Sequence, residues 1–523
     1  MPRTSAAKLN SVGPFARARR TQAEPRQSWS GLLTLCLLAA LPSFAATCES
    51  LSSFTLTGGS ITQATDVAPG SFTQPGARAA KAGAPNPYAA LPAFCRIAAT
   101  LKPTPDSDIR IEVWLPSSAT WNTSLESVGN GAWAGSIGYA AMATALAAGY
   151  ATASTDTGHT GGSVTFVVDH PERLTDFAYR AVHEMTVAAK AIAAAYYGGA
   201  PKHSYFNGCS TGGRQALAEA QRYPNDYDGI IAGDPDGFAT HVQASQLFIA
   251  QMAHLSEAAY IPPAKYALLH NAVLEACDAL DGVKDRVLED PRKCHFNPAS
   301  LECKGADAAD CLTTAQVQTA RATYAGEKPL LHGLEYGSES GWSSLSGPQP
   351  LGLALDTYQY LVFNDPKWDY HTLKPEKDVA YADKVAGPLM NSNDSNLKPF
   401  FSHGGKLILY HGWADPGIPP LYSVNYYTAV VEKMGGAKKT SDEIRLFMVP
   451  GMGHCAGGDG PNTFNAMSAL AQWVEQKKAP DQILATHSIR GAVDRTRPLC
   501  PYPQTAVYKG SGSTDEAANF SCK

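Results

Sequence analysis

Over the first half of the chain, segments in which apolar and polar residues alternate, as in a strand, are followed by segments in which apolar residues recur at the spacing of a helix. The strand-like segments are 108–116 (DIRIEVWLP), 150–155 (YATAST) and 203–208 (HSYFNG). The helix-like segments, with apolar residues at a period of about 3.6, are 137–150, 177–198 and 213–223. Strands that alternate with helices predict an α/β fold built on a mostly parallel sheet.

This rhythm stops after residues 228–237 (DGIIAGDPDG) and resumes far downstream. The residues in between, 238–396, are rich in glycine, proline, serine and aromatic residues and hold four cysteines. Strand-like segments return at 406–414 (KLILYHGWA) and 443–453 (EIRLFMVPGMG), and a helix-like segment follows at 462–478. We see no internal repeat, and one α/β domain interrupted by an insertion explains this order better than tandem domains.

Composition and charge exclude one broad class of function. The chain has 523 residues, of which 44% are hydrophobic and 17% charged, as is ordinary for a globular protein with a sizeable core. Its formal net charge of -5 supplies no basic stripe for a nucleic-acid backbone. Nucleic acid is therefore not an expected partner.

The N-terminus has the order of a secretory signal peptide. Four arginines, at positions 17, 19, 20 and 26, precede the apolar run 31–41 (GLLTLCLLAAL), and small residues follow in 42–47 (PSFAAT). The alternative, a membrane anchor, is disfavoured because the run is well short of the roughly 20 residues that span a bilayer. We predict a signal peptide over 1–46, a mature chain that begins near Ala46 or Thr47, and a secreted or periplasmic protein without a membrane segment.

Ten cysteines remain once this segment is removed, and an even number in an oxidising compartment predicts five disulfides. Sequence alone does not give the connectivity. The spacing suggests the pairs Cys48–Cys95, Cys277–Cys294, Cys303–Cys311 and Cys500–Cys522, which leaves Cys209 and Cys455 for each other.

Residues 208–212 (GCSTG) fit the nucleophile-elbow pattern G-x-S-x-G, in which a strained turn exposes a serine at the start of a helix. In a chain with 46 glycines the pattern also arises by chance, and the plain alternative is a glycine-rich turn with a capping serine. The position of Ser210 between a strand and a helix favours the elbow.

A serine becomes a nucleophile when a base removes its proton and an acid orients that base, and in α/β-hydrolases the order is Ser, Asp, His. Asp415 follows the strand-like segment 406–414, and His454 follows 443–453. Alone, an aspartate after a strand is most often a turn or cap residue, and a lone histidine most often has a structural role. The two together in this order predict a triad. A disulfide from Cys209 to Cys455 would join the immediate neighbours of Ser210 and His454.

The motifs GCSTGGR, HGWADPGIPP and GMGHC together resemble the tannase and feruloyl esterase family, over essentially the whole mature chain. The resemblance implies an α/β-hydrolase fold with a large inserted lid domain. It also implies Ser210 as nucleophile, Asp415 as orienting acid, His454 as general base and a disulfide that links the two sites. The expected domains are a hydrolase core over 47–237 and 397–523 and a lid over 238–396.

An oxyanion hole requires backbone N–H donors next to the nucleophile. One should be the amide of Thr211, which follows Ser210. For the second we select Gly131, in the loop 129–135 (GNGAWAG), with Ala132 as the alternative. The plain interpretation of that loop is a turn.

Three carboxylates crowd a short loop in the insertion. Asp278, Asp281 and Asp285 lie between Cys277 and Cys294, where a solvated acidic turn and a site for a hard cation are about equally consistent with the chemistry. The family resemblance implies a structural calcium ion in this loop, with carbonyl oxygens from Val283 and Val287 as further ligands. The predicted cofactor is therefore Ca²⁺, outside the catalytic chemistry.

The resemblance implies substrates that are esters of aromatic acids: hydroxycinnamoyl esters of plant cell wall, galloyl esters of tannins, or mono(2-hydroxyethyl) terephthalate from polyester. Thr211 matches the feruloyl esterase pattern, and residues 341–374 contain no arginine to pair with a terephthalate carboxylate. We rank feruloyl-type esterase first, tannase second and terephthalate monoester hydrolase third. Lid aromatics are candidates either for an acyl pocket or for core packing: Trp342, Tyr358, Tyr360, Phe363 and Trp368.

A different class is a catalytically inactive binding module, stabilised by calcium, on a hydrolase scaffold. The intact Ser, Asp, His and cysteine set argues against it, because an inactive copy would commonly have lost one member.

Overall fold

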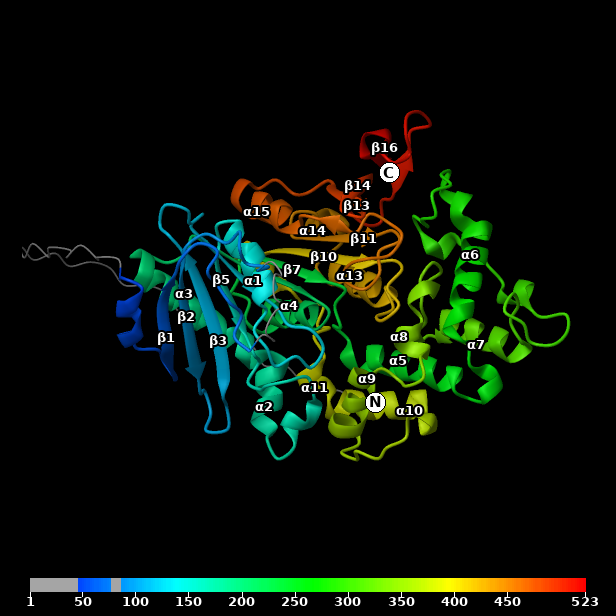
Figure 1. Ribbon diagram of the computed structural model, residues 1–523, viewed down its shortest axis with the longest axis horizontal. Helices are drawn as coiled ribbons and strands as arrows, with labels where there is room; N and C mark the ends of the chain where they lie inside the picture. The colour runs from blue at the N-terminus through cyan, green and yellow to red at the C-terminus, as the bar shows by residue number, and fades with distance from the viewer. Residues whose placement is uncertain (1–45, 77–85) are drawn as a thin grey trace, which may run out of the picture. The chain divides into compact units, whose positions relative to one another are not determined.

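The computed structural model describes residues 46–76 and 86–523 (Figure 1). The predicted signal peptide lies, except for Ala46, outside the described residues. None of the described helices combines the length and the apolar character that a membrane crossing requires.

A nine-stranded sheet forms the centre of the molecule, in the order β1-β2-β3-β5-β4-β6-β7-β10-β11 (Figure 1). The antiparallel part contains β1 (Gly59–Val67), β2 (Phe94–Leu101) and β3 (Ile109–Pro116), with β3 paired to β5 (Ala151–Thr155). From β5 onward all pairs are parallel, through β4 (Ser124–Val128), β6 (His203–Cys209), β7 (Gly229–Gly233), β10 (Lys406–Gly412) and β11 (Ile444–Val449). The predicted α/β fold with a mostly parallel sheet is confirmed.

The parallel strands are buried on both faces because helices cover each side. In β7, Ile230 packs into the cluster with α3 (Ala181–Tyr197), α4 (Thr211–Arg222) and α13 (Leu421–Lys433), whereas Ile231 packs into the cluster with α15 (Ala466–Gln476). Residues alternate in the same way along β10. Side chains that point to opposite faces at each step explain why β7 and residues 407–409 of β10 show an unbroken apolar run, without a polar face.

The predicted elements of the first half agree with the structure to within a few residues. Segment 137–150 contains α1 (Tyr139–Ala147), and 213–223 matches α4, which begins two residues earlier. Segment 177–198 starts as a π-helical turn, Asp176–Arg180, before α3 begins. The sequence analysis does not predict β1, a half-exposed edge strand of largely polar sequence, GSITQATDV, and it also omits β2, FCRIAATL, in which buried and half-buried residues alternate.

The segment 238–396, predicted as the lid, is mainly helical. Its longer helices are α5 (Ala239–Ala253), α6 (Tyr266–Cys277), α7 (Thr314–Ala325) and α10 (Pro375–Val385), and they contribute two apolar clusters on either side of α5. Trp342 and Tyr358 are fully buried in these clusters, so core packing accounts for both. The exact domain limits stay a prediction.

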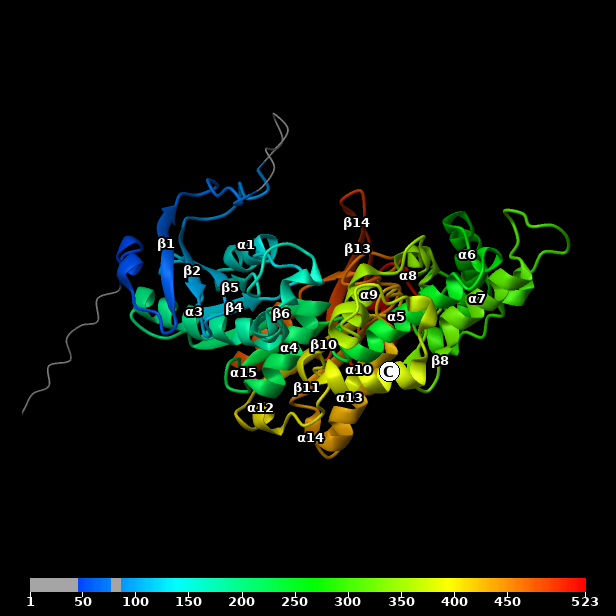
Figure 2. The same cartoon turned by 90° about the horizontal axis from the view of Figure 1, so that it is seen from below.

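The remaining elements are short. The other helices are α2 (Pro171–Thr175), α8 (Ser343–Ser346), α9 (Gly352–Asp356), α11 (Gly387–Met390), α12 (Lys398–Ser402) and α14 (Ala437–Thr440). The small strands are β8 (Gly326–Glu327), β9 (Leu331–His332), β12 (Thr463–Phe464), β13 (Ile483–Ile489), β14 (Ala492–Leu499), β15 (Ala506–Tyr508) and β16 (Phe520–Cys522). Figure 2 shows the sheet with α4 and α13 below it and the insertion helices to one side.

All five predicted disulfides are present, with the predicted partners. They are Cys48–Cys95, Cys209–Cys455, Cys277–Cys294, Cys303–Cys311 and Cys500–Cys522. Four of them close loops of 8 to 47 residues, whereas Cys209–Cys455 joins residues 246 positions apart. That long-range bond connects the carboxyl end of β6 to the loop after β11.

Candidate active site

Ser210 occupies a strained turn between β6 and α4. Its backbone has φ 64° and ψ -122°, a conformation that L-residues rarely adopt and that costs on the order of 1–3 kcal/mol. Hydrogen bonds hold the turn on both sides, from the Ser210 amide to the Gly233 carbonyl (3.0 Å) and from the Arg214 amide to the Ser210 carbonyl (3.0 Å). The elbow predicted from the sequence is therefore present in geometry as well as in pattern.

The glycines around Ser210 are required by close contact between backbones. A Cβ on Gly208 would lie 2.4 Å from the Gly212 carbonyl oxygen, and one on Gly213 would lie 2.4 Å from the Gly233 carbonyl oxygen. A Cβ on Gly212 would approach the Asn130 carbonyl oxygen to 3.0 Å. The strand, the helix start and the 129–135 loop thus meet at distances that no side chain permits.

Asp415 and His454 form a hydrogen-bonded pair just past β10 and β11. The distance from His454 Nδ1 to Asp415 Oδ2 is 2.7 Å, and the Asp415 side chain is fully buried. Because Nδ1 donates to the carboxylate, Nε2 is the nitrogen that can accept a proton. The sequence therefore placed both residues correctly at strand ends, and the structure joins them.

The carboxylate of Asp415 is surrounded by donors. Oδ1 accepts from the amides of Gly417 (2.7 Å) and Ile418 (2.9 Å), while His411 Nε2 lies 3.2 Å from Oδ2. Burial alone would raise the pKa of Asp415, but the charges and hydrogen bonds of His454 and His411 outweigh it and lower the pKa well below its usual range. Asp415 is therefore an anion at neutral pH.

The pKa of His454 reflects its acidic neighbours. Burial would lower this pKa, but Asp415, and after it Asp234 and Asp236, raise it to about 9. Asp234, Asp415 and His454 each place one ligand atom within 4.8 Å of the others. Sequence reasoning missed both Asp234, which directly follows β7, and His411, which lies near the carboxyl end of β10, where functional side chains of such folds collect.

The Cys209–Cys455 disulfide brings the loops of Ser210 and His454 together, with 6.0 Å between its two Cα atoms. Each cysteine is the direct chain neighbour of one of these residues. Among the described residues, Ser210 Oγ forms no hydrogen bond with His454, so the covalent bridge and the strand ends are what place the two loops. Catalytic hydrogen bonds are often long without substrate and shorten in the complex.

The 129–135 loop lies directly against the elbow. Thr211 Oγ1 donates to the Ala132 carbonyl (3.1 Å), and the Asn130 amide donates to Gln215 Oε1 (3.0 Å). The amides of Gly131 and Ala132 have no hydrogen-bond partner within the described part of the chain. Both amides are therefore available as donors, and the assignment of either to an oxyanion hole stays a prediction.

The acidic loop is closed by the Cys277–Cys294 disulfide, and its carboxylates bind the backbone of their own loop. Asp278 accepts from the Arg286 amide (2.9 Å), Asp281 from the Val283 amide (2.9 Å), and Asp285 from the Val287 amide (3.1 Å). Asp285 also pairs with Arg497, from β14. The three carboxylates are not among the described groups whose ligand atoms all lie within 4.8 Å of one another.

Two carbonyl groups of this loop lack partners. Val283 and Val287 are buried, yet within residues 46–76 and 86–523 no donor reaches the carbonyl oxygen of either. Buried backbone carbonyls are almost always hydrogen-bonded. These are the same two residues whose carbonyls the sequence analysis assigned to a cation.

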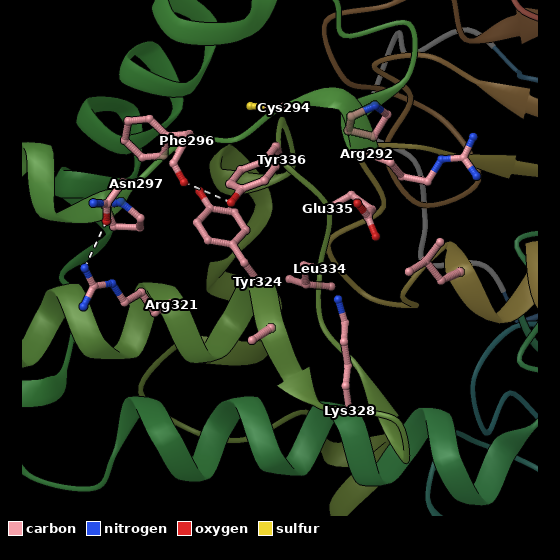
Figure 3. A pocket seen from close by; sticks show the side chains of 14 residues that line it. Arg292, Cys294, Phe296, Asn297, Arg321, Tyr324, Lys328, Leu334, Glu335 and Tyr336 are labelled. Carbon is pink, nitrogen blue, oxygen red and sulfur yellow. Dashed lines mark hydrogen bonds between the residues drawn. The ribbon is translucent and has the colours of Figure 1, made fainter.

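Two cavities border the insertion, and neither is lined by Ser210 or His454. One, of about 540 Å³, is lined by Arg292, Arg321, Lys328 and Glu335 together with aromatic residues, as Figure 3 shows. Burial raises the pKa of Glu335 there to about 7. The other, of about 480 Å³, is mainly apolar and lies between α13 and the β8–β9 hairpin.

Comparison with known proteins gives a consistent result. The family model for tannase and feruloyl esterase matches residues 95–350 and 351–523. An uncharacterised esterase of Xanthomonas campestris pv. campestris is 37% identical over 551 residues, covering 94% of each chain. A probable feruloyl esterase B-2 of Aspergillus terreus is 36% identical over 455 residues, covering 81% of this chain and 85% of that protein.

Solved structures agree. The crystal structure of feruloyl esterase B from Aspergillus oryzae has a TM-score of 0.84 at 31% identity, covering 91% of this chain and 99% of that one. Tannin acyl hydrolase from Aspergillus niger has a TM-score of 0.75 at 22% identity, covering 90% and 92%. At that identity the second comparison supports the fold alone.

Gly208→Ala should destabilise the protein by about 1–3 kcal/mol, because the new methyl group meets backbone atoms that cannot move away singly. Chemical denaturation measures the loss. Gly162→Ala is the matched control, since a Cβ there meets nothing within 4 Å. Equal stability of the two variants would contradict the close packing of the elbow.

The double variant Cys209→Ala, Cys455→Ala should stay folded on its four other disulfides, although the chain-entropy model assigns the lost bond an upper value of roughly 5 kcal/mol. Ester turnover should fall about a hundredfold, because a shift of about 1 Å between catalytic groups has that effect. The measurements are kcat and the melting curve of the same sample.

The control for the cysteine variant is Cys303→Ala, Cys311→Ala, which removes a bond between residues 8 positions apart in the insertion. This variant should keep most of its activity. If both double variants lost activity in proportion to stability, the Cys209–Cys455 bond would serve stability alone.

Proposed function

The chain belongs to the tannase and feruloyl esterase family of carboxylic ester hydrolases, and from that premise we propose that Ser210, His454 and Asp415 are its catalytic triad. The observation that carries the proposal is the His454–Asp415 hydrogen bond in a loop that a disulfide joins to the strained turn of Ser210. A serine held with φ 64° in a turn that is covalently joined to the loop of an oriented imidazole supports nucleophilic catalysis.

The proposed reaction proceeds through an acyl-enzyme. His454 Nε2 takes the proton of Ser210 Oγ while that oxygen attacks the ester carbonyl, and Asp415 stabilises the imidazolium that forms. The amides of Thr211 and Gly131 bind the oxyanion of the tetrahedral intermediate. His454 then protonates the leaving alcohol, and a water molecule activated by the same imidazole releases the acid.

For the acyl group we propose a hydroxycinnamoyl acid of the feruloyl type. Relatives named as feruloyl esterases reach 36% identity, and the feruloyl esterase B structure matches at 31%. Tannase activity is the second candidate, because the tannin acyl hydrolase shares the fold at only 22% identity. Hydrolysis of the terephthalate monoester is third, since residues 341–374 offer no arginine for its carboxylate.

The alcohol portion of the substrate is proposed to be a plant polysaccharide or, for the third candidate, a polyester fragment. Such substrates lie outside the cell, and five disulfides support export through an oxidising compartment after removal of residues 1–46. The inactive binding module is disfavoured, because a fully buried carboxylate oriented onto a histidine has no purpose in simple binding.

For the acidic loop we propose a structural calcium ion, held by Asp278, Asp281 and Asp285 and by the carbonyl oxygens of Val283 and Val287. The donor set fits a hard cation, since it contains only oxygen, and the carbonyls of the two buried valines accept no hydrogen bond from any described residue. When bound, the ion neutralises the carboxylates and ties the loop together. The residues of the proposed triad lie elsewhere, so the ester chemistry does not involve this ion.

Ser210→Ala should abolish ester hydrolysis without unfolding the protein, with a loss on the order of 10⁶ in kcat as in a comparable triad enzyme. The assay compares methyl ferulate, methyl gallate and mono(2-hydroxyethyl) terephthalate. We expect methyl ferulate to give the highest kcat/KM. Residual activity within tenfold of the wild type would exclude Ser210 as the nucleophile, and a preference for methyl gallate would favour tannase.

Removal of calcium should lower the melting temperature, because a ligand that binds only the folded state stabilises it by mass action. Asp281→Ala should abolish this response to chelator and to added Ca²⁺. Glu275→Gln, which removes a charge from the exposed face of α6, is the control and should respond like the wild type. A melting curve that is unchanged when metal is stripped and restored would contradict the site.

A further inference from the structure

The carboxylate of Asp234 lies deep in the candidate active site without a role in the proposed mechanism. Asp234 follows β7 directly and is fully buried, and its backbone has φ 35°. One of its oxygens lies within 4.8 Å of ligand atoms of both Asp415 and His454. Two carboxylates this close, shielded from water, do not both carry a charge at low cost.

Hydrogen-bond donors decide which of the two keeps the charge. Asp415 has four donors in reach, whereas Asp234 Oδ1 accepts one amide, from Gly412 (2.9 Å). The other oxygen, Oδ2, lies 3.3 Å from Cys209 Sγ. Because that sulfur belongs to a disulfide, it carries no proton, and a hydrogen bond there requires the carboxyl group to donate.

His411 is the remaining place for a proton. Its Nε2 lies 3.1 Å from the Ile418 carbonyl, which can only accept, so Nε2 carries a hydrogen. Ser423 Oγ lies 2.7 Å from Nδ1 and can donate to it. A neutral His411 is therefore fully hydrogen-bonded. Burial lowers the pKa of His411, but Asp234, whose Oδ1 lies 3.7 Å from Nε2, and Asp415 outweigh burial and raise it, so His411 is the competing site for the proton.

We propose that Asp234 is a positioning residue that holds a proton against the Cys209–Cys455 disulfide and thereby makes it easier for His454 to lose its proton and reach the neutral form that a general base requires. This inference rests on the proposed triad. Burial raises the pKa of Asp234 to about 7, with His411 opposing and Asp415 supporting the shift. The groups that face it are His411 and Tyr410 from β10, Asp415, His454, and Asp236 on its own loop.

The sign of the effect follows from charge. While Asp234 is protonated, His454 has one negatively charged neighbour fewer, and it loses its own proton at a lower pH. When Asp234 ionises as the pH rises, its charge stabilises the imidazolium and delays that loss. The two groups therefore titrate together, and an Asp234 that is always neutral would make His454 available as a base at lower pH.

The first test is Asp234→Asn, which keeps an acceptor for the Gly412 amide and cannot ionise. The apparent pKa of the acid limb of kcat/KM for methyl ferulate should fall by on the order of 1 unit, so the variant should be several-fold faster than the wild type near pH 8, where Asp234 of the wild type is ionised, and equal to it near pH 6, where Asp234 is protonated. KM should stay unchanged, because Asp234 is buried. Superimposable pH profiles would reduce Asp234 to a structural role.

Asp156→Asn is the matched control. Asp156 is also buried, burial also raises its pKa to about 7, and it accepts the amides of Arg110 and Gly158. None of its hydrogen bonds reaches the triad. A shift of the acid limb in this variant as large as in Asp234→Asn would show that the effect is general and would overturn the proposal.

The second test reads the proton without turnover. Infrared difference spectra between pH 5 and pH 9 should contain a carboxylic-acid band that Asp234→Asn removes and Asp156→Asn retains. If Asp234→Asn does not fold, Asp234→Gly suits the positive φ and also lacks the acid. If the carboxylic-acid band of the wild type persisted in both Asp234→Asn and Asp234→Gly, the proton would lie on His411 and the proposal would be wrong. Failure of Ser210→Ala to abolish activity would reject the triad and leave this spectrum unaffected.

Discussion

The Cys209–Cys455 disulfide is the constraint on which the candidate active site depends. Ser210 and His454 lie at the ends of different strands, 244 positions apart by their residue numbers, and the structure gives them no direct hydrogen bond. The covalent bond between their neighbours replaces the many weak contacts that would otherwise have to place two loops within reaction distance. A strained serine turn is also less able to relax when its preceding residue is anchored to a second loop.

Close backbone packing supplies the other half of that constraint. Gly208, Gly212 and Gly213 allow β6, α4 and the 129–135 loop to approach within distances that exclude a Cβ. The packing of the strained Ser210 turn against the loop that carries Gly131 and Ala132 therefore depends on the absence of side chains at these glycines.

The number of hydrogen-bond donors around each carboxyl group decides which acids of this site are ionised. Asp415 is surrounded by N–H groups and stays ionised, whereas Asp234 and Asp236 have few donors and burial raises their pKa values to about 7 and about 6. A histidine among three carboxyl groups would hold its proton too firmly if all three were charged. The arrangement of donors, more than the count of acids, sets the basicity available to His454.

By itself the sequence determined the alternation of strands and helices, the serine elbow and the order Ser, Asp, His, because local periodicity and short motifs carry that information. The spacing of the cysteines suggested their five pairs, and the structure established them. The sequence did not reveal β1, a half-exposed edge strand of largely polar sequence, nor β2 beside it, nor the helical character of 238–396, where glycine and proline obscure the period. Only the tertiary structure decided that Asp234 and His411 join Asp415 and His454, and that the carbonyls of Val283 and Val287 are left without partners. The physical reason is that such contacts arise where several strand ends meet, and no pattern along one strand records which neighbours the sheet will bring to it.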